Sequence, residues 1–478
     1  MLILMVILVL LAAWIAVLLI RAARFVPQEQ QVPAQTPVSV DRDKIIRDMQ
    51  DLIRCRTVSN RDDSLVEWEE FEKCRALVRE RFPKLFGRAQ YERIGKSGML
   101  FTIRGRRSDA PGVLMAHYDV VPVQEDKWSR PPFGALIEDG VLWGRGTLDT
   151  KGTFCAILEA AEQLIGEGFV PENDLYLSFS GEEEIDGGSC TDIVHALRDR
   201  GVKPAFVLDE GGAVVSGVFP GVKKECAVVG VAEKGSLNID MTIAGGGGHA
   251  SAPPVHSILG ELSAAVVALE NHPFPARLTA PVRGMFEVLG RESSFGLKII
   301  LANLWCFWPL FALICRKSGG ELNAMVRTTN AITRAQASDA YNVLPPAARV
   351  GMNVRLLEGD TIGSAVERMK RIVKNDRIQF HVVNGSNPSI SSVIGGEGWE
   401  RLSEAIGETW EGALVSPYLM MACSDSRHYC EITDKVYRFS AMRLSKEERG
   451  LIHGNDERIP LETLITTVEF YVRMIRKL

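Results

Sequence analysis

The sequence predicts an α/β domain with a mainly parallel sheet, a smaller α+β domain inserted into it, and a transmembrane helix at the N-terminus. Short apolar runs alternate with helical patterns from residue 41 onwards. The pattern changes near residue 232 and resumes near residue 390, and the first 20 residues carry no charged side chain. We therefore expect one α/β domain in two parts, residues 41–232 and 390–478, with residues 233–389 inserted between them.

The N-terminal residues 1–20 form an uninterrupted apolar run, which as a helix would be about 30 Å long, the thickness of a bilayer core. A cleaved signal peptide would carry basic residues ahead of a shorter run, and none precede this one. We expect a single-pass anchor. Arg21 and Arg24 follow the run, so the positive-inside rule favours the cytoplasmic face for the rest of the chain. Residues 21–40 contain a Pro- and Gln-rich stretch typical of a stalk.

The α/β domain begins with a helical pattern at residues 41–59 and ends with one at residues 461–478. Between them lie strand-like runs and a helix that a glycine terminates. The strand-like runs are residues 112–120, 174–180 and 205–212, and the helix is residues 151–168. This order is typical of a parallel sheet with crossover helices.

The insertion combines strands and helices. Residues 236–245 and 347–357 alternate in the manner of strands with one exposed face. Residues 257–270 and 363–374 show helical periodicity. The mixture predicts a small α+β domain.

Residues 299–315 are a second run without a charged residue. The run is short for a bilayer, and Asn303 and Pro309 interrupt it. We favour a buried or interfacial helix within the inserted domain. A membrane-dipping element and a true span are the alternatives.

Composition narrows the function. The net charge is −5 and the isoelectric point is near 6.0, so there is no basic surplus for nucleic acid. The nine cysteines are odd in number, are scattered and contain no CxxC pair. They support neither a disulfide framework nor a thiolate zinc site, and they fit a reducing compartment.

Acidic and histidine residues follow the predicted strands. His117 and Asp119 are two positions apart on one strand and therefore share a face. Asp149 lies in a Gly-rich turn before a helix, and the runs SGEEEIDGG (180–188) and LDEGG (208–212) end two further strands. The carboxyl ends of parallel strands meet at one edge of a sheet, so we expect these groups to gather there.

One histidine with several carboxylates and no cysteine suits Zn²⁺ or a similar divalent ion. Two ions that share a bridging carboxylate would neutralise the crowded acids and activate a water molecule. A further ligand is needed, and residues 424–429 and 453–457 each offer a histidine.

These motifs, in this order, resemble a known family. HYD (117–119), GRGTLDTKG (144–152), EEE (182–184), LDEGG (208–212), GGGGHAS (245–251) and HGNDE (453–457) are similar to motifs of the dinuclear zinc peptidases and amidohydrolases. That family includes aminoacylase-1, acetylornithine deacetylase, succinyl-diaminopimelate desuccinylase, glutamate carboxypeptidase and carboxypeptidase S. The resemblance covers residues 41–478 and is strongest to the carboxypeptidase S branch. It implies a catalytic domain with an inserted lid or dimerisation domain.

The resemblance implies a role for each motif residue. One zinc ion would be held by His117, Asp149 and Asp209, and the other by Asp149, Glu184 and His453, with Co²⁺ or Mn²⁺ as possible substitutes. His428 is the rival for the last ligand. Asp119 would orient His117, and Glu183 would be the general base. Because Glu182 stands where the family has Asp, a one-residue shift of roles to Glu182 and Glu183 stays open.

Further residues are implied for the substrate. His249 would stabilise the oxyanion, and in several dimeric members the partner subunit supplies this histidine. Asn342, Arg355 and Arg427 would hold the α-carboxylate of the substrate, which suits the planar fork of arginine. A turn residue is the alternative for His249, and a surface residue is the alternative for Arg355.

The resemblance therefore implies a membrane-anchored hydrolase that cleaves an amide next to a free carboxylate. Its substrates would be short peptides or N-acyl amino acids, and the inserted domain would be the place for a homodimer contact. An inactive homologue that only binds a ligand and an aminopeptidase of the same clan are the alternatives.

Overall fold

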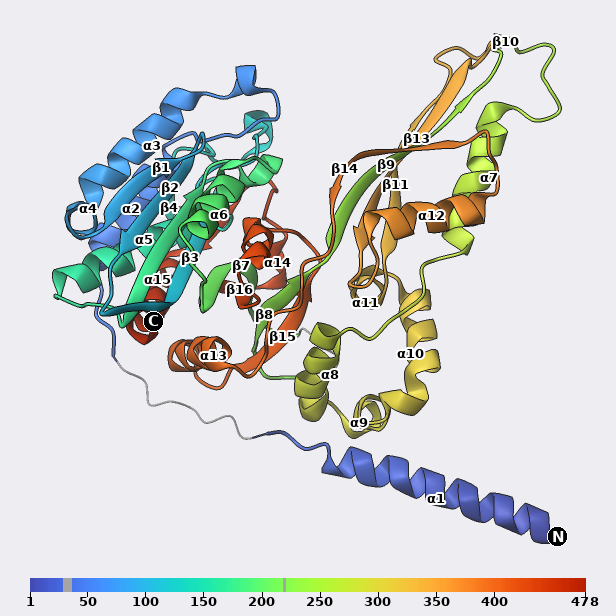
Figure 1. Cartoon of the computed structure of the whole chain (residues 1–478), viewed down its shortest axis with the longest axis horizontal. Helices are drawn as coiled ribbons and strands as arrows, with labels where there is room; N and C mark the ends of the chain where they lie inside the picture. The colour runs from blue at the N-terminus through green and yellow to red at the C-terminus, as the bar shows by residue number, and fades with distance from the viewer. Residues whose placement is uncertain (29–36, 218–220) are drawn as a thin grey trace.

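The computed structural model describes residues 1–28, 37–217 and 221–478. Its main element is an eight-stranded sheet in the order β1-β2-β6-β3-β7-β16-β8-β15 (Figure 1). The strands are β1 (Gln90–Ile94), β2 (Gly98–Ile103), β3 (Arg107–His117), β6 (Asn173–Ser180), β7 (Phe206–Val215), β8 (Cys226–Glu233), β15 (Leu414–Met420) and β16 (Val436–Arg443).

This sheet is mixed, whereas the sequence predicted a mainly parallel one. Its centre, β6-β3-β7-β16, is parallel throughout. The strands β1 and β2 form an antiparallel hairpin that also pairs antiparallel with β6. On the other side, β8 runs antiparallel to β7 and β16 but parallel to β15. The alternation of strands and helices therefore described the centre of the sheet and not its edges.

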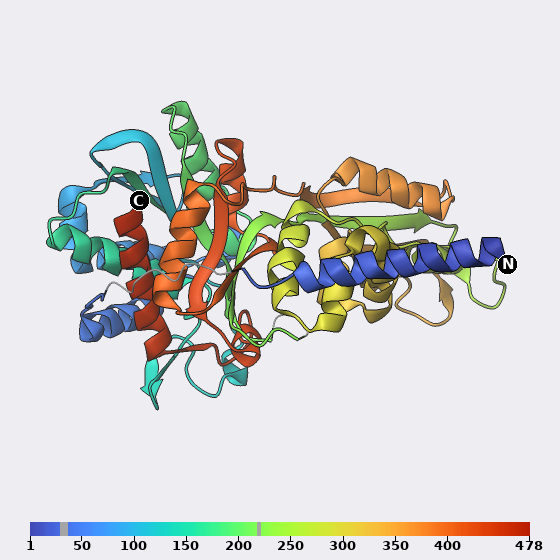
Figure 2. The same ribbon diagram turned by 90° about the horizontal axis from the view of Figure 1, so that it is seen from below.

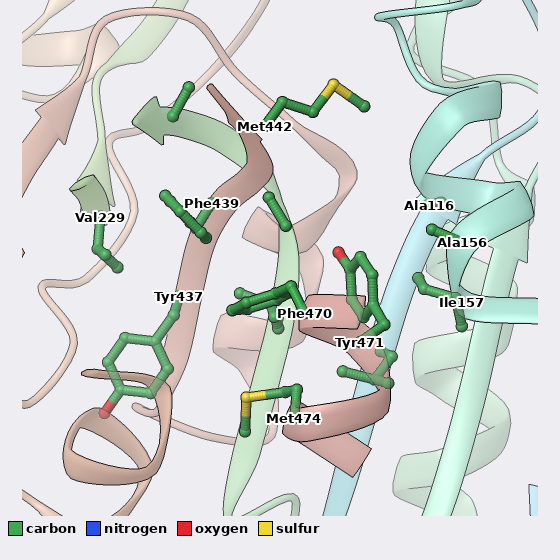
Figure 3. Packing of buried hydrophobic residues seen from close by; sticks show 14 of the residues in the cluster. Ala116, Ala156, Ile157, Val229, Tyr437, Phe439, Met442, Phe470, Tyr471 and Met474 are labelled. Carbon is green, nitrogen blue, oxygen red and sulfur yellow. The ribbon is translucent and has the colours of Figure 1, made fainter. Parts of the chain in front are cut away.

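Helices cover both faces of the sheet. They are α2 (Arg42–Ile53), α3 (Trp68–Arg81), α4 (Pro83–Arg88), α5 (Lys151–Gly166), α6 (Ser189–Asp199), α13 (Glu397–Thr409), α14 (Lys446–Arg449) and α15 (Leu461–Lys477). The alternation in β3 shows how this layering arises. Val113 and Met115 are buried in the cluster with α6, and Leu114 and Ala116 in the cluster with α5 and α15. Figure 3 shows part of the second cluster, including Ala156, Ile157, Phe439, Phe470, Tyr471 and Met474.

A second sheet of four strands is formed by the part of the sequence between β8 and α13. Its order is β11-β13-β9-β14, and all of its pairs are antiparallel. The helices α7 and α12 pack on it and share a separate apolar cluster with it. The bounds are β9 (Gly235–Ala244), α7 (Ile258–Asn271), β11 (Thr329–Gln336), β13 (Ala347–Leu356), α12 (Ile362–Val373) and β14 (Gln379–Ser386). At its far tip the short strands β10 (Gly248–His249) and β12 (Val343–Leu344) pair (Figure 1).

The segment between α7 and β11 forms four helices, α8 (Ala280–Glu292), α9 (Phe295–Leu301), α10 (Leu304–Ser318) and α11 (Gly320–Val326). Their buried side chains belong to the cluster of the first sheet, and α8 packs on β15. The apolar run 299–315 is therefore not one helix, because α9 and α10 meet at an angle of 105°. Leu301, Phe311 and Cys315 are buried, while Trp305 and Leu310 are exposed.

The N-terminal helix α1 (Leu2–Arg24) is the one described helix that is long and apolar enough by itself to cross a membrane. Its mean hydropathy reaches 3.3, and only Leu18 and Ala22 are buried. Figures 1 and 2 show its C-terminal end beside α8 and α9, and Figure 1 shows its N-terminal end pointing away from the rest of the chain. A signal sequence near the N-terminus can meet the same two criteria of helix length and hydropathy.

Candidate metal centre

The acidic and histidine motifs meet at the carboxyl edge of three adjacent parallel strands. His117 is the last residue of β3. Glu183 and Glu184 follow β6 in the short helix η3 (Glu183–Ile185), and Glu210 lies in β7. Asp149 immediately precedes Thr150, the N-cap residue of α5, and the peptide bond between these two residues is cis. The order β6-β3-β7 thus brings together groups that are far apart in the sequence.

Asp149 lies between two histidines. Its Oδ1 is 3.0 Å from His117 Nε2, and its Oδ2 is 3.0 Å from His453 Nε2. Each imidazole also faces a second carboxylate: Glu210 Oε1 is 3.4 Å from His117 Nε2, and Glu184 Oε2 is 3.0 Å from His453 Nε2. The arrangement has two halves that share Asp149, and each half contains one histidine and one further carboxylate.

Among the residues that the structure describes, the third predicted carboxylate, Asp209, shares no hydrogen bond or ion pair with His117. It is buried and accepts a hydrogen bond of 3.0 Å from the backbone N–H of Ser426. The neighbouring Glu210 takes the place beside His117. The strand was expected to end at residue 212, but β7 continues to Val215. Only glycine fits at residue 212, because a Cβ there would lie 1.7 Å from the Val228 carbonyl oxygen of the neighbouring strand.

Asp119 connects His117 to the glutamates. The backbone N–H groups of Glu183 and Glu184 each donate to one of its carboxylate oxygens over 3.2 Å. On its other side, Asp119 Oδ1 lies 3.3 Å from His117 Nδ1, which is also 3.0 Å from the Asp119 backbone oxygen. His117 and Asp119 are both buried, so these contacts fix the ring orientation in the way carboxylates support metal-binding imidazoles.

The three consecutive glutamates point in different directions. Glu182 accepts hydrogen bonds from Ser97 Oγ and Ser189 Oγ and is therefore occupied behind the site. Glu183 groups with His117 and Glu210, and Glu184 groups with His117 and Asp149, with the candidate ligand atoms of each group within 4.8 Å of one another. This geometry favours the roles given to Glu183 and Glu184 over the shift to Glu182 and Glu183.

The rival histidine lies elsewhere. His428 belongs to η4 (Asp425–Glu431), where its Nδ1 is 3.3 Å from Thr191 Oγ1 of α6. His453 is in contact with both Asp149 and Glu184, and its side chain remains 55% exposed. The structure thus brings His453 rather than His428 to the acidic cluster.

Glu457, the last residue of HGNDE, has a positioning role that the sequence reasoning missed. It is fully buried and accepts hydrogen bonds from the backbone N–H groups of Gly146, Leu148 and Asp149 at 2.8–3.2 Å. Arg145 Nη1 donates to it over 2.5 Å. Pairing of β17 (Arg458–Pro460) with β5 (Val141–Trp143) brings these segments together. The available signal in the sequence was its position, four residues after His453 in the same motif.

The charges of the site shift one another's pKa values. Burial and the charge of Asp149 raise the pKa of Glu210 to about 8. Burial also raises the pKa of Glu183 well above its ordinary value. Hydrogen bonds to Asp149 and Glu184 raise the pKa of His453 to about 10. Burial opposes the charged form of His117, but the charge of Glu210 and the hydrogen bonds to Asp119 and Asp149 hold its pKa well above the usual value.

The residues fit divalent cations. Glu184 Oε1 is buried and has no hydrogen-bond partner among the residues that the structure describes, although its other oxygen contacts His453. An unpaired buried carboxylate oxygen is costly unless a cation or water satisfies it. The two imidazoles with the three carboxylates in contact with their Nε2 atoms, and no thiolate, form a donor set that suits zinc, cobalt or manganese.

A cavity of about 600 Å³ opens from this cluster. Asp149, Glu183, Glu184, Glu210 and His453 line one part of it. Its other walls include the apolar side chains Leu148, Ala213, Val215, Val228, Tyr418, Met420, Leu444 and Ile452. The metal-ligating groups therefore lie in a wall of a mostly apolar chamber.

The two predicted arginines lie near this chamber. Arg355 Nη1 is 3.5 Å from Cys423 Sγ, and Cys423 lines the cavity. Arg427 Nη1 donates to the Ser424 oxygen over 3.1 Å, and Nη2 forms an ion pair with Asp186. Neither lies among the cavity-lining residues itself.

His249 and Asn342 lie together but away from the metal centre. Both are exposed at the tip of the second sheet, where the Ala250 N–H donates to the Asn342 oxygen over 3.0 Å. His249 Nδ1 contacts only Ser251, through its hydroxyl (2.8 Å) and its backbone N–H. Figure 1 shows this tip, labelled β10, at the far end of the second sheet from β3 and β7.

Comparison with known proteins finds a matching family and relatives over most of the chain. The model of peptidase family M20/M25/M40 matches residues 113–477. The N-fatty-acyl-amino acid synthase/hydrolase PM20D1 of Xenopus tropicalis is 36% identical over 91% of this chain and 86% of its own length. The probable carboxypeptidase S-like 2 of Dictyostelium discoideum is 31% identical over 96% of this chain and 91% of its own.

A solved structure shares the architecture. The M20 family metallo-carboxypeptidase Sso-CP2 of Sulfolobus solfataricus superposes with a TM-score of 0.68 over 90% of this chain and 98% of its own, at 17% identity. At that identity the likeness concerns the fold alone. The family match nevertheless begins in β3 and ends in α15, and so it includes every group of the metal centre. Together with the carboxylate shared by two histidines, this establishes that the chain belongs to peptidase family M20/M25/M40.

Proposed function

We propose that this protein is a two-metal amidohydrolase that cleaves N-acyl amino acids at the amide next to the free α-carboxylate. One observation carries the proposal: Asp149 lies between His117 and His453, and each histidine faces a further carboxylate. Two cations bound there would polarise a water molecule and the substrate carbonyl. Zinc is our choice of ion, with cobalt or manganese as substitutes.

The ligand assignment follows the distances. One cation would be held by His117, Asp149 and Glu210, and the other by Asp149, Glu184 and His453. Glu210 here replaces Asp209, whose carboxylate accepts from the Ser426 N–H instead. The buried Asp119 orients His117 and also holds the backbone of Glu183 and Glu184.

Glu183 is the proposed general base. It lines the cavity next to the ligands, and burial raises its pKa, which brings it closer to the range useful for proton transfer at neutral pH. Glu183 would take a proton from the attacking water and pass it to the leaving nitrogen.

The cavity supports an apolar acyl group on the substrate. Its lining includes Val215, Val228, Tyr418, Met420 and Leu444, and its volume of about 600 Å³ lies in the usual range of small-molecule sites. The Xenopus tropicalis relative is named for N-fatty-acyl amino acids, which combine such a chain with a free carboxylate. Arg427 and Arg355 would bind that carboxylate once a substrate draws them from Asp186 and Cys423.

A carboxypeptidase acting on short peptides is the second candidate. It leaves the same free carboxylate next to the cleaved amide, and the Dictyostelium discoideum relative carries that name. An inactive binding homologue would not need the complete set of ligands and base that this chain keeps. An aminopeptidase would need a group for a free amine in place of the arginines.

The distant tip supports a dimer. The strand β10, which ends in His249, lies at the far end of the second sheet from β3 and β7 (Figure 1). We infer that this sheet joins two copies, so that the tip of one copy completes the site of the other, with His249 as oxyanion donor. The inserted segment that contains this sheet, residues 233–389, would then act as the lid and dimerisation domain.

The helix α1 supports a membrane anchor. Its exposed apolar surface would be covered by lipid, and Arg21 and Arg24 in its last turn favour a cytoplasmic location for the rest of the chain. All nine cysteines are free, which fits that reducing side.

The test is a substrate panel. Zinc-reconstituted protein is assayed on N-acyl amino acids of increasing chain length, on the corresponding fatty amides without a carboxylate, and on dipeptides. We expect hydrolysis of long-chain N-acyl amino acids, loss of activity with a chelator and recovery with zinc. Preference for dipeptides would support the carboxypeptidase instead, and no hydrolysis of either class would contradict the proposal.

A further inference from the structure

A second cavity lies where the C-terminal end of α1 meets α8 and α9. Its volume is about 510 Å³, and four arginines line it: Arg21, Arg24, Arg283 and Arg291. The acidic residue in its wall is Glu287. Within residues 1–28, 37–217 and 221–478, none of the four guanidinium groups forms an ion pair. An excess of unpaired positive charge around one cavity calls for an anion.

The other walls of this cavity are apolar. They include Phe25, Leu278, Phe286, Leu301, Leu304 and Trp305. A site for inorganic phosphate or a nucleotide phosphate would need polar surroundings on all sides. A wall that combines four arginines with a larger number of apolar residues suits a molecule with an anionic group on an apolar body.

The arginines are held in place by neighbouring groups that carry no charge. Arg21 donates through Nη2 to the Ala302 oxygen over 3.0 Å and through Nε to Asn303 Oδ1 over 3.1 Å. Arg291 Nη1 donates to the Val26 oxygen over 3.1 Å, and its guanidinium lies 4.7 Å from the centre of the Phe25 ring. These contacts position two cations without neutralising them.

The same contacts fix α1 to the helix pair α9–α10. Asn303, at the bend between α9 and α10, also donates through Nδ2 to the Leu18 oxygen of α1 over 3.1 Å. The cavity therefore lies at the C-terminal end of the long apolar helix α1, where a bilayer would change from hydrocarbon to headgroups.

The exposed side chains of α9 and α10 fit that position. Phe295, Trp305, Leu310, Leu313 and Ile314 are exposed although all are large and apolar. Exposed aromatic and aliphatic residues beside arginines are typical of helices that lie in the interface of a membrane. The uncharged apolar run at residues 299–315 thus begins next to α1 and can contact the same membrane surface.

We propose that this arginine-lined cavity binds the phosphate headgroup of an anionic phospholipid whose acyl chains lie along α1 and the exposed side of α9 and α10. The planar fork of arginine matches phosphate oxygens in pairs, and basic pockets between membrane helices bind such headgroups. The inference rests on the proposal that α1 lies in a bilayer. Bound lipid would hold the catalytic part in one orientation on the membrane surface.

The experiment uses the full chain in a nonionic detergent and counts bound lipids by native mass spectrometry. The probes are dioctanoyl phosphatidylglycerol, dioctanoyl phosphatidylcholine and inorganic phosphate at equal concentration. We expect one phosphatidylglycerol per chain, bound about tenfold or more tightly than phosphatidylcholine. The variant Arg283→Gln/Arg291→Gln should lose about tenfold or more of that affinity.

The matched control is Arg316→Gln/Lys317→Gln, which removes two exposed charges from the other end of α10 and should bind as the unmodified chain does. Because Arg291 also contacts Val26 and Phe25, the single variant Arg283→Gln provides a second measurement without that contact. Unchanged binding by both cavity variants would overturn the proposal. So would equal binding of phosphatidylcholine, or displacement of the lipid by inorganic phosphate.

Flotation of the unmodified chain with neutral phosphatidylcholine vesicles tests the anchor separately. If the chain floats but binds no phosphatidylglycerol, the lipid site is wrong and the anchor stands. If the chain does not float, the anchor itself is wrong, and the lipid site loses its basis.

Discussion

The metal centre and the tip of the second sheet both carry residues that the family motifs assign to catalysis. The two regions differ in how many contacts those residues make within the chain and in how deeply they are buried. Around Asp149, each side chain has at least one partner from another element, and Asp119 and Glu457 are completely buried behind them. At the tip, the His249 side chain is exposed, and among the described residues its Nδ1 bonds to Ser251 of the same loop. The first region is complete within one chain, whereas the second has the form of a part that needs another surface.

The strongest test of the first region is Glu183→Gln. The substitution keeps the size of the side chain but removes its ability to accept a proton, so kcat should fall by about 10²- to 10⁴-fold. Metal content, measured by elemental analysis, should stay the same because Glu183 is not a proposed ligand. The exposed Glu69→Gln in α3 is the control and should retain full activity. Undiminished turnover by Glu183→Gln would remove it from the mechanism.

The second region is tested by His249→Ala. If a second copy places this histidine at the oxyanion, kcat should fall by about 10²- to 10³-fold. The exposed His256→Ala, from the loop that follows the tip, is the matched control.

Mixing inactive variants separates a partner's histidine from a local one. Co-refolded His249→Ala and Glu183→Gln chains should recover about a quarter of the unmodified activity, because half of the dimers are mixed and each contains one complete site. Recovery requires that the tip of one copy serves the site of the other. If the two variants stay inactive together although they form mixed dimers, the comparison between the two regions fails.

A smaller effect decides between the adjacent acids Asp209 and Glu210. Glu210→Gln should lower the affinity for one of the two metal ions by at least about tenfold, because the amide is a weaker ligand than the carboxylate. Asp209→Asn should keep both ions, since Asp209 accepts from the Ser426 N–H and Glu210 is the carboxylate in contact with His117. Metal stoichiometry after dialysis against a buffered zinc solution measures both. The opposite result would restore the ligand set first expected from the sequence.

The choice between these two acids shows where sequence reasoning ends. His117, Asp149 and Glu184 follow elements whose type and order the sequence predicts, and parallel strands bring such ends together. Which of two consecutive residues faces the site depends on strand parity. In β7 the pairing with β16 shifts register between Arg438 and Phe439, more than 200 residues away in the chain. That contact leaves no local pattern near Asp209.

The same limit applies to the apolar run at residues 299–315. Its composition predicted an apolar helix, but the structure bends at Asn303, whose side chain hydrogen-bonds to α1, some 285 residues earlier in the chain. Glu457 is another such case, since the backbone N–H groups that it binds belong to a loop some 310 residues earlier in the chain. The sheet centre and the identity of most site residues were thus predictable, whereas register, bends and positioning contacts came from residues distant in the sequence.

The last prediction concerns protons, and it also distinguishes the two regions. In the metal-free chain, burial first, and then the charge of Asp149, raises the pKa of Glu210 to about 8, and hydrogen bonds to Asp149 and Glu184 raise that of His453 to about 10. Both groups therefore carry protons at neutral pH, and a cation must displace them. Zinc affinity should rise with pH from about 6 to 9, by up to about tenfold per pH unit for each proton released.

Competition with a chromophoric chelator at several pH values measures this slope. Glu210→Gln removes one of the titrating groups, so its slope should be smaller by about one proton. His249→Ala should leave the slope unchanged, because the tip contributes no ligand. An affinity that is independent of pH, or that rises on acidification, would contradict the protonation of Glu210 and His453. A changed slope in His249→Ala would show instead that the tip reaches the metal ions, and the two regions would then form one electrostatic unit.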